Sequence, residues 1–311
     1  MNGLSRRLLQ GVVRSWVHTA LDPARPVHGQ RRMIAMAARL LPPPRGVRKH
    51  AQTLADMRGF RFEPTEIRRP GTVLYLHGGG FVLGSPSTHC NIASRLAQRC
   101  QLPVVLPEYR LAPEARWPSA RDDACRAWQA LVDAGTDPAH IVVAGDSAGA
   151  GLALAVAQHA VASKGRTPAA LLCFSPWVDL SLGGATLTSL ASTDPMLSPQ
   201  WLAWAARTYL GGHPADAPTA SPLFGDMRGL PPTLVQVAGR EVLLDDAIRL
   251  AEAIRAAGGK ASLQIEPHLW HVWQMFAGVL PAADAALSRA ADFVDQVLPT
   301  PAKQVAEHVA Q

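Results

Sequence analysis

The sequence VVAGDSAGAG at residues 142–151 indicates how this chain folds. An apolar run that begins at Ile141 stops at Gly145, a serine follows two residues later, and a helix of small residues begins near Gly149. A strand, a sharp turn and a helix in this order are typical of a G-x-S-x-G elbow, where the tight turn lifts the serine hydroxyl above the sheet. The pattern predicts that Ser147 is a nucleophile.

Two other structures would also place glycines between a strand and a helix. A phosphate-binding loop would carry the residues GK[ST] or a second glycine pair before the helix, and neither is present here. A plain turn with a capping serine fits the stretch alone, so the rest of the chain must supply the partners that a nucleophile needs.

Apolar strand-like runs alternate with helical patterns along most of the chain. The runs typical of strands are 73–76, 104–106, 141–144, 170–174, 234–237 and 263–265. The helical patterns are 90–99, 120–134, 152–163, 246–257 and 283–297. This alternation predicts an α/β fold, with a mostly parallel sheet flanked by helices and its chemistry at the carboxyl ends of the strands.

Two segments fall outside the alternation. Apolar residues recur at helical spacing over residues 4–21, and a second helical pattern over 30–41 ends at three prolines. About sixty residues separate two of the predicted strands, which is too many for a plain crossover. We therefore expect the following segments: a helical arm and cap at 1–50, an α/β core at 51–180 and 224–298 with one or two edge strands at 58–70, a cap insertion at 181–223, and a flexible tail at 299–311.

Composition restricts the class of protein. The 311 residues are 48% hydrophobic and 17% charged, as in an ordinary globular protein, and no apolar run is long enough to cross a membrane. Residues 1–70 carry 14 Lys and Arg against 4 Asp and Glu, but these arginines are dispersed among apolar residues without a nucleic-acid-binding motif. We expect a solvated helical face there, with no nucleic-acid partner and no stable membrane insertion. The four cysteines form no CxxC pair, so we expect reduced, buried thiols in the cytoplasm. The sequence leaves the oligomeric state open, a homodimer included.

A serine nucleophile needs a base, an acid and donors for an oxyanion. His268 and His271 both follow the last predicted strand, where a base belongs in the chain order serine, acid, histidine. Glu241 follows the strand before it, while Asp245 and Asp246 resemble first-turn residues of the next helix, where negative charge is favourable. The donors are expected in the glycine loop that follows the first core strand and at the N–H of the residue after the serine: Gly78, Gly79, Gly80 and Ala148.

Aromatic residues near these motifs are candidates for substrate contact. Trp201, Trp204 and Tyr209 punctuate the predicted insertion, and Phe81 closes the glycine loop. They suit an ordinary core stripe and the wall of a substrate pocket equally well, and a cap must provide both.

Six motifs in this chain resemble those of the bacterial hormone-sensitive-lipase-like esterases of the α/β-hydrolase fold, over about residues 55–298. They are HGGGF at 77–81, EYRLAPE at 108–114, GDSAGAG at 145–151, SPW at 175–177, EVLLDDA at 241–247 and HVW at 271–273. The resemblance implies that Ser147 is the nucleophile and His271 the base. It also implies that Gly78, Gly79 and Ala148 donate to the oxyanion, with Gly80 adjoining, and that Asp146 orients the glycine loop.

The acid departs from the family's pattern. Many relatives have Asp-Pro-Leu where this chain has Glu241, Val242 and Leu243, so Glu241 matches the acid position with a longer side chain and Asp245 stays an alternative. The resemblance implies a serine carboxylesterase for small, short- to medium-chain esters that needs no metal or organic cofactor. A lactone or amide hydrolase, a lipase active at lipid interfaces and a ligand-binding relative without turnover are the alternatives.

Overall fold

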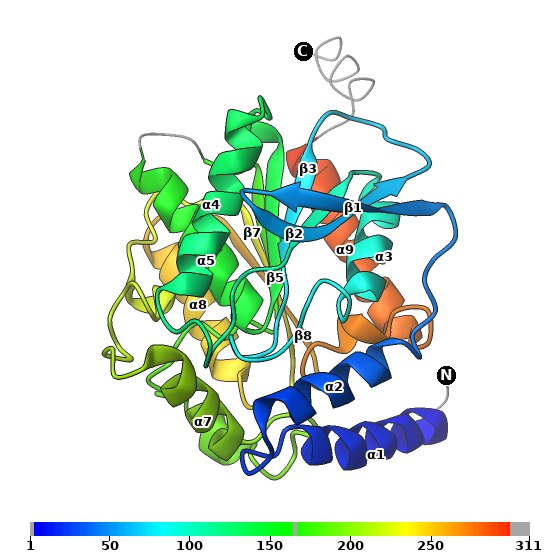
Figure 1. Cartoon of the computed structure of the whole chain (residues 1–311), viewed down its shortest axis with the longest axis vertical. Coiled ribbons are helices and arrows are strands. Elements are labelled where there is room, and N and C mark those ends of the chain that lie inside the picture. The colour runs from blue at the N-terminus through cyan, green and yellow to red at the C-terminus, as the bar shows by residue number, and fades with distance from the viewer. Residues whose placement is uncertain (1–2, 164–166, 299–311) are drawn as a thin grey trace.

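Eight strands form a twisted sheet in the order β1-β2-β4-β3-β5-β6-β7-β8 (Figure 1). The computed structural model describes residues 3–163 and 167–298. Neighbouring strands from β4 across to β8 are parallel, which confirms the predicted α/β fold. The parallel strands are β3 (Thr72–Leu76), β4 (Val104–Pro107), β5 (Ile141–Asp146), β6 (Ala170–Phe174), β7 (Thr233–Ala238) and β8 (Ala261–Glu266).

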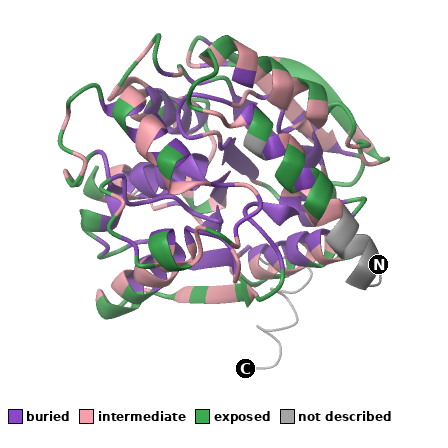
Figure 2. Cartoon of the chain, turned by 90° about the horizontal axis from the view of Figure 1, so that it is seen from below, coloured by how far each residue is buried: buried purple, intermediate pink, exposed green. Residues whose placement is uncertain are grey.

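Helices cover both faces of the sheet, as Figure 1 shows. The helices on one face are α3 (Cys90–Cys100) and α9 (Pro281–Val297). Those on the other are α4 (Ser119–Asp133), α5 (Ala148–Ala162) and α8 (Leu244–Ala256). Because both faces are covered, every residue of β3 to β7 is buried, whereas β8 at the edge alternates between partly buried and exposed positions (Figure 2). Continuous apolar runs are the expected sequence signature of such strands.

The edge strands differ from the prediction of one or two strands at 58–70. The structure has β1 (Val47–Leu54) and β2 (Met57–Pro64), which form an antiparallel hairpin and begin four residues before the expected core boundary at 51. The two turn residues, Ala55 and Asp56, both have positive φ angles of 49° and 65°, as a tight hairpin requires. β1 escaped detection because its residues VRKHAQTL are mostly exposed and carry no apolar alternation.

Three cap helices lie together at the end of the sheet where the parallel strands terminate (Figure 1). They are α1 (Gly3–Ala20) and α2 (Val27–Ala38) from the predicted arm and α7 (Pro199–Leu210) from the predicted insertion, which also contains the short helix α6 (Thr186–Ser189). The indole of Trp201 donates a hydrogen bond of 3.1 Å to the side-chain oxygen of Gln30, which is fully buried. The arm and the insertion are therefore in direct contact. The predicted tail at 299–311 lies outside the described residues.

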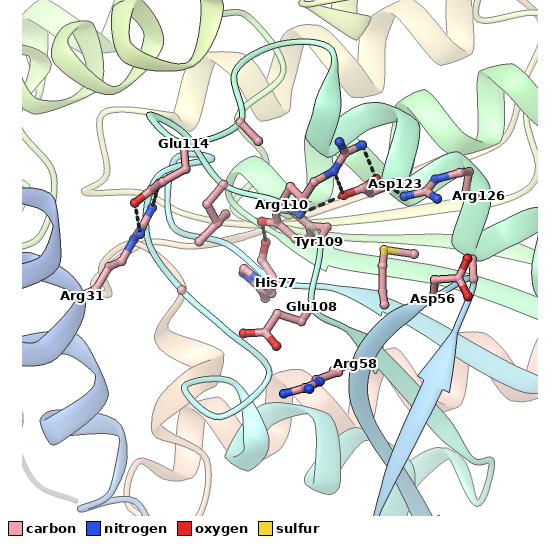
Figure 3. Close-up of a pocket in the computed structure, with 15 residues that line it drawn as sticks. Arg31, Asp56, Arg58, His77, Glu108, Tyr109, Arg110, Glu114, Asp123 and Arg126 are labelled. Atoms are coloured by element: carbon pink, nitrogen blue, oxygen red, sulfur yellow. Dashed lines mark hydrogen bonds and ion pairs between the residues drawn. The ribbon is translucent and has the colours of Figure 1, made fainter.

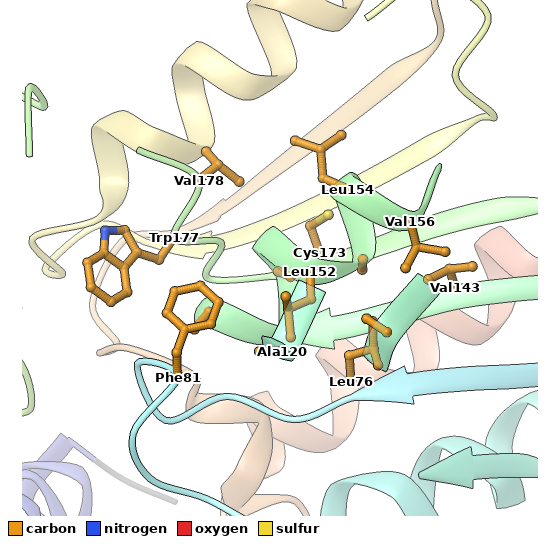
Figure 4. Packing of buried hydrophobic residues seen from close by; sticks show 14 of the residues in the cluster. Leu76, Phe81, Ala120, Val143, Leu152, Leu154, Val156, Cys173, Trp177 and Val178 are labelled. Atoms are coloured by element: carbon orange, nitrogen blue, oxygen red, sulfur yellow. The ribbon is translucent and has the colours of Figure 1, made fainter. Parts of the chain in front are cut away.

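The interior beside α5 is packed with aliphatic and aromatic side chains. Figure 4 shows Val156 of α5 near Val143 of β5, and the rings of Phe81 and Trp177 next to each other, all in one buried cluster. All four cysteines are free thiols, and three are buried as expected, while Cys90 is partly exposed. Within the described ranges, none of the helices combines the length and the apolar character that a membrane span requires.

Candidate active site

Ser147 occupies a strained elbow between β5 and α5. Its φ and ψ angles are 53° and −125°, a conformation that non-glycine residues rarely adopt. The flanking glycines make the turn sterically feasible, because a Cβ atom on Gly145 would lie 2.3 Å from the Gly149 carbonyl oxygen, and one on Gly149 would lie 2.1 Å from that of Leu76. Strain of this kind persists where the surrounding structure fixes it and is common at functional sites.

A buried histidine lines the same pocket as Ser147 and contacts a buried glutamate. His271 follows β8, and its Nδ1 atom is 3.5 Å from Oε1 of Glu241, which follows β7. The other carboxylate oxygen of Glu241 accepts hydrogen bonds from the Ser175 hydroxyl at 2.8 Å and from the Ala238 N–H at 3.2 Å. A His–carboxylate contact of 3.5 Å is longer than an ordinary hydrogen bond.

Two opposing effects act on the pKa of His271. Burial acts to lower the pKa of His271, but the hydrogen bond to Glu241 and the negative charges of Glu241, Asp194 and Asp146 outweigh it. The pKa of His271 is therefore raised above its ordinary value of 6.5. A base with its pKa near the working pH can both take and return a proton.

The structure separates the alternatives that the sequence left open for base and acid. His268 is exposed, whereas His271 faces the Glu241 carboxylate. Asp245 is 26% exposed in the first turn of α8, where it forms a 3.0 Å ion pair with Arg249 and accepts a hydrogen bond from the Ala185 N–H. Asp245 is thus engaged at the helix terminus, and Glu241 is the carboxylate that contacts the imidazole.

The glycine loop lies next to Ser147, and its hydrogen bonds show which of the predicted oxyanion donors are already bound within the protein. Gly79 and Gly80 line the same pocket as Ser147 and His271. Gly78 differs from the expectation, because its N–H donates to Oδ1 of Asp146 at 3.1 Å and is not free for a substrate. Ala148 is the first residue of α5, where a backbone N–H has no partner within the helix.

Asp146 connects the glycine loop to the sheet. Besides the Gly78 N–H, its Oδ1 atom accepts a 2.8 Å hydrogen bond from the Tyr75 hydroxyl, and Oδ2 lies 3.4 Å from His89 Nε2. Burial acts to raise the pKa of Asp146, but the interactions with His89 and Tyr75 outweigh it and lower that pKa. Asp146 therefore orients the loop in its charged form.

The pocket above Ser147 is small and mostly apolar. Its volume is about 100 Å³. Six of its lining residues come from the cap: Val17, Leu21 and Ile34 from the arm, and Met196, Leu197 and Trp201 from the insertion. The arm and the insertion therefore both contribute walls to the pocket that contains the nucleophile.

Comparisons with known proteins place this geometry in a family. A family model described as the alpha/beta hydrolase fold matches residues 73–275. The chain belongs to the α/β-hydrolase family. Among solved structures, this hydrolase is similar to an esterase from the bacterial hormone-sensitive lipase family, with a TM-score of 0.89, 34% sequence identity, and coverage of 93% of this chain and 98% of that one. The resemblance to this branch of the family is thereby confirmed.

Curated relatives of the hydrolase carry names of the same kind. It is 36% identical over 290 residues to an esterase of Acinetobacter venetianus, which covers 92% of this chain and 93% of that one. It is 40% identical over 223 residues to an acetyl-hydrolase of Streptomyces hygroscopicus, with coverage of 72% and 75%. The hydrolase is therefore a member of an esterase family.

The aromatic residues expected to contact substrate divide into two groups. Among the residues that the structure describes, Trp201 lines the pocket of the hydrolase, and the other three do not. Phe81 and Tyr209 are buried and stack on each other with ring centroids 4.1 Å apart, so they belong to the core. Trp204 packs against Trp201 with ring centroids 6.1 Å apart.

Most of the pocket residues that the sequence did not single out are apolar, and His89 is an exception. Val17, Leu21 and Ile34 were visible as the apolar face of the arm, but that face predicts burial and not which residues meet a substrate. Met196 and Leu197 follow Asp194, which offered no motif. Their role depends on where the insertion folds back.

A larger pocket of about 780 Å³ is lined by His77, the first residue of the glycine loop, and by charged side chains that include Arg31 and Glu114 (Figure 3). Its charged side chains largely neutralise one another, since Arg31 binds Glu114 while Arg110 and Arg126 bind Asp123. Its inner wall includes His77, where burial lowers the pKa to about 3 and keeps the imidazole neutral. It contains neither Ser147 nor His271 and is separate from the candidate active site of the hydrolase.

Proposed function

We propose that this hydrolase is a serine carboxylesterase for small esters with short- to medium-chain acyl groups. The observation that carries the proposal is that Ser147, on its strained elbow, lines one pocket with His271, and that His271 contacts the buried Glu241. A hydroxyl becomes nucleophilic when an adjacent base accepts its proton, and the base requires an acid that fixes its tautomer and stabilises its charged form.

The reaction proceeds by acyl transfer in two halves. Neutral His271 accepts the Ser147 proton while the serine oxygen attacks the ester carbonyl, and the N–H groups of Gly79, Gly80 and Ala148 stabilise the oxyanion. The tetrahedral intermediate collapses, His271 donates its proton to the departing alcohol, and an acyl-enzyme forms. Water, activated by His271, then attacks the acyl carbonyl, and release of the carboxylate regenerates Ser147.

Two features favour short chains. The pocket has a volume of about 100 Å³ and is lined by apolar side chains of the cap. The acetyl-hydrolase relative is named for a short acyl group. We expect kcat/KM to be highest for acetyl to butyryl esters, because longer chains must displace Trp201 or other cap residues.

A comparison of Ser147→Ala with the parent protein tests the nucleophile. The substrates are p-nitrophenyl esters from acetyl to dodecanoyl, and the control is Ser189→Ala in α6, a serine on the exposed side of the cap. We expect the control to match the parent and Ser147→Ala to lose at least about 10⁴-fold in kcat. Turnover retained in Ser147→Ala would refute the assignment, and an optimum at dodecanoyl would refute the preference for short chains.

A further inference from the structure

Ser175 lies between the three segments that carry Ser147, Glu241 and His271. It is the first residue after β6, it is fully buried, and its φ angle of 47° is in the left-handed region. Its N–H donates a 2.7 Å hydrogen bond to the carbonyl of Gln236 in β7, and the carbonyl of the preceding Phe174 accepts the N–H of Ser147 at 2.9 Å. The Ser175 backbone is therefore fixed between the elbow and the strand that leads to Glu241.

The Ser175 hydroxyl connects the segment that follows β7, which carries Glu241 (the acid loop), to the segment that follows β8, which carries His271 (the base loop). Oγ accepts the N–H of Val272, the residue after His271, at 3.0 Å. Because a backbone N–H can only donate, the hydroxyl proton is directed to its other neighbour, Oε2 of Glu241, at 2.8 Å. With the Ala238 N–H also donating to Oε2, this oxygen is occupied and Oε1 faces the imidazole.

The base loop needs such a contact because its backbone is strained. Val272 has a φ angle of 46°, and a β-branched residue in this region is an outlier. A conformation of this kind persists only where neighbouring groups fix it. The hydrogen bond from the Val272 N–H to Ser175 Oγ fixes the peptide that directly follows His271.

We propose that Ser175 is a positioning residue that fixes Glu241 and His271 in one geometry through a single hydroxyl. The inference rests on the proposed function, because it concerns the same triad. Ser175 does not line the pocket, so it acts on the substrate only through these two residues. The expected consequence of its removal is a loss of catalytic rate without a loss of substrate binding.

Three carboxylates act on His271, each from a different segment. Glu241 follows β7, Asp194 lies in the cap insertion, and Asp146 ends β5. Asp194 is held independently of Ser175, because it accepts the N–H groups of Met196, Leu197 and Val242. Removal of the Ser175 hydroxyl therefore affects the contact with Glu241 and leaves the other two carboxylates in place.

Ser175→Ala is the principal variant, and Ser221→Ala is the matched control. Ser221 is equally buried, and its hydroxyl also accepts one backbone N–H, from Leu180, and donates once, to the Ala215 carbonyl, but it lies outside the pocket. Ser175→Cys is the second variant; it preserves side-chain volume with a weaker donor and remains informative if the alanine variant does not fold. Kinetics with p-nitrophenyl acetate, thermal midpoints and an NMR titration of the His271 imidazole are measured for all four proteins.

For Ser175→Ala we expect kcat to fall about 10- to 100-fold with KM changed less than about twofold, since small displacements of catalytic groups cost rates of this size. We also expect the His271 titration to move to lower pH, because burial lowers its pKa once Glu241 no longer faces it. Ser175→Cys should change both quantities in the same direction, and Ser221→Ala should lower only the thermal midpoint. The inference is overturned if the Ser175 variants lose only thermal stability, or if the His271 titration stays in place or moves to higher pH. Because the titration needs no turnover, it tests Ser175 even if the parent protein hydrolyses no ester.

Discussion

Replacement of Glu241 by glutamine, with Asp245→Asn as its control, separates the two carboxylates that the sequence offered as the acid. Both variants exchange one carboxylate oxygen for an NH₂ group at nearly constant volume. In the structure, Oε2 of Glu241 accepts two hydrogen bonds, from the Ser175 hydroxyl and the Ala238 N–H. The amide oxygen of glutamine takes over this position, which directs the NH₂ group at Nδ1 of His271.

The expected magnitude follows from that orientation. An NH₂ group donates and does not accept, so Nδ1 must become the acceptor and the His271 proton must reside on Nε2. In that tautomer Nε2 cannot accept the proton of Ser147, and the analogous change in a serine protease costs about 10⁴-fold in kcat. A loss of this size corresponds to about 5.4 kcal/mol of transition-state stabilisation.

The control is expected to behave differently because Asp245 is engaged elsewhere. Its partly exposed ion pair with Arg249 contributes about 0–1 kcal/mol to the free energy of unfolding, and its loss does not reach the imidazole. We expect kcat of Asp245→Asn to remain within about twofold of the parent.

Steady-state kinetics with p-nitrophenyl acetate, together with thermal midpoints, provide the assay. The reasoning is refuted if Asp245→Asn loses more kcat than Glu241→Gln, or if Glu241→Gln retains more than about a tenth of the parental kcat while remaining folded. A circular-dichroism spectrum equal to that of the parent protein excludes misfolding as the cause of a loss.

Two further predictions concern the base and the pocket. Only neutral His271 can accept the serine proton, and the pKa of His271 is raised above 6.5. We therefore expect kcat/KM to fall as the pH drops, with the midpoint of the fall above pH 6.5. A pH–rate profile measured from pH 5 to 9 with a midpoint below 6.5 would contradict the electrostatic argument. Trp201→Ala should enlarge the pocket and raise the ratio of kcat/KM for the octanoyl ester to that for the acetyl ester, while lowering the free energy of unfolding by about 3–5 kcal/mol. The control, Trp204→Ala, changes a tryptophan outside the pocket and should leave this ratio unchanged. Equal ratios in the two variants would show that Trp201 does not limit chain length.

The sheet and the elbow could be predicted from the amino-acid sequence alone. Buried parallel strands are continuous apolar runs, so β3 to β7 were visible without tertiary information. The elbow was equally visible, because a turn this tight excludes a Cβ atom on both sides of Ser147 and so requires Gly145 and Gly149. Both features are local, since a few neighbouring residues set the conformation.

Tertiary structure decided which residues meet. Glu241 and Asp245 are four residues apart, and so nothing local separates them, but folding brings the first to His271 and the second to Arg249. The same holds for Gly78, whose N–H is bound by Asp146 from β5, and for the pocket, where Trp201 meets residues of the arm while Tyr209 packs into the core. Contacts between residues distant in the chain depend on how the loops and the cap fold back over the sheet. The spacing of residues in the sequence does not encode which of them come into contact.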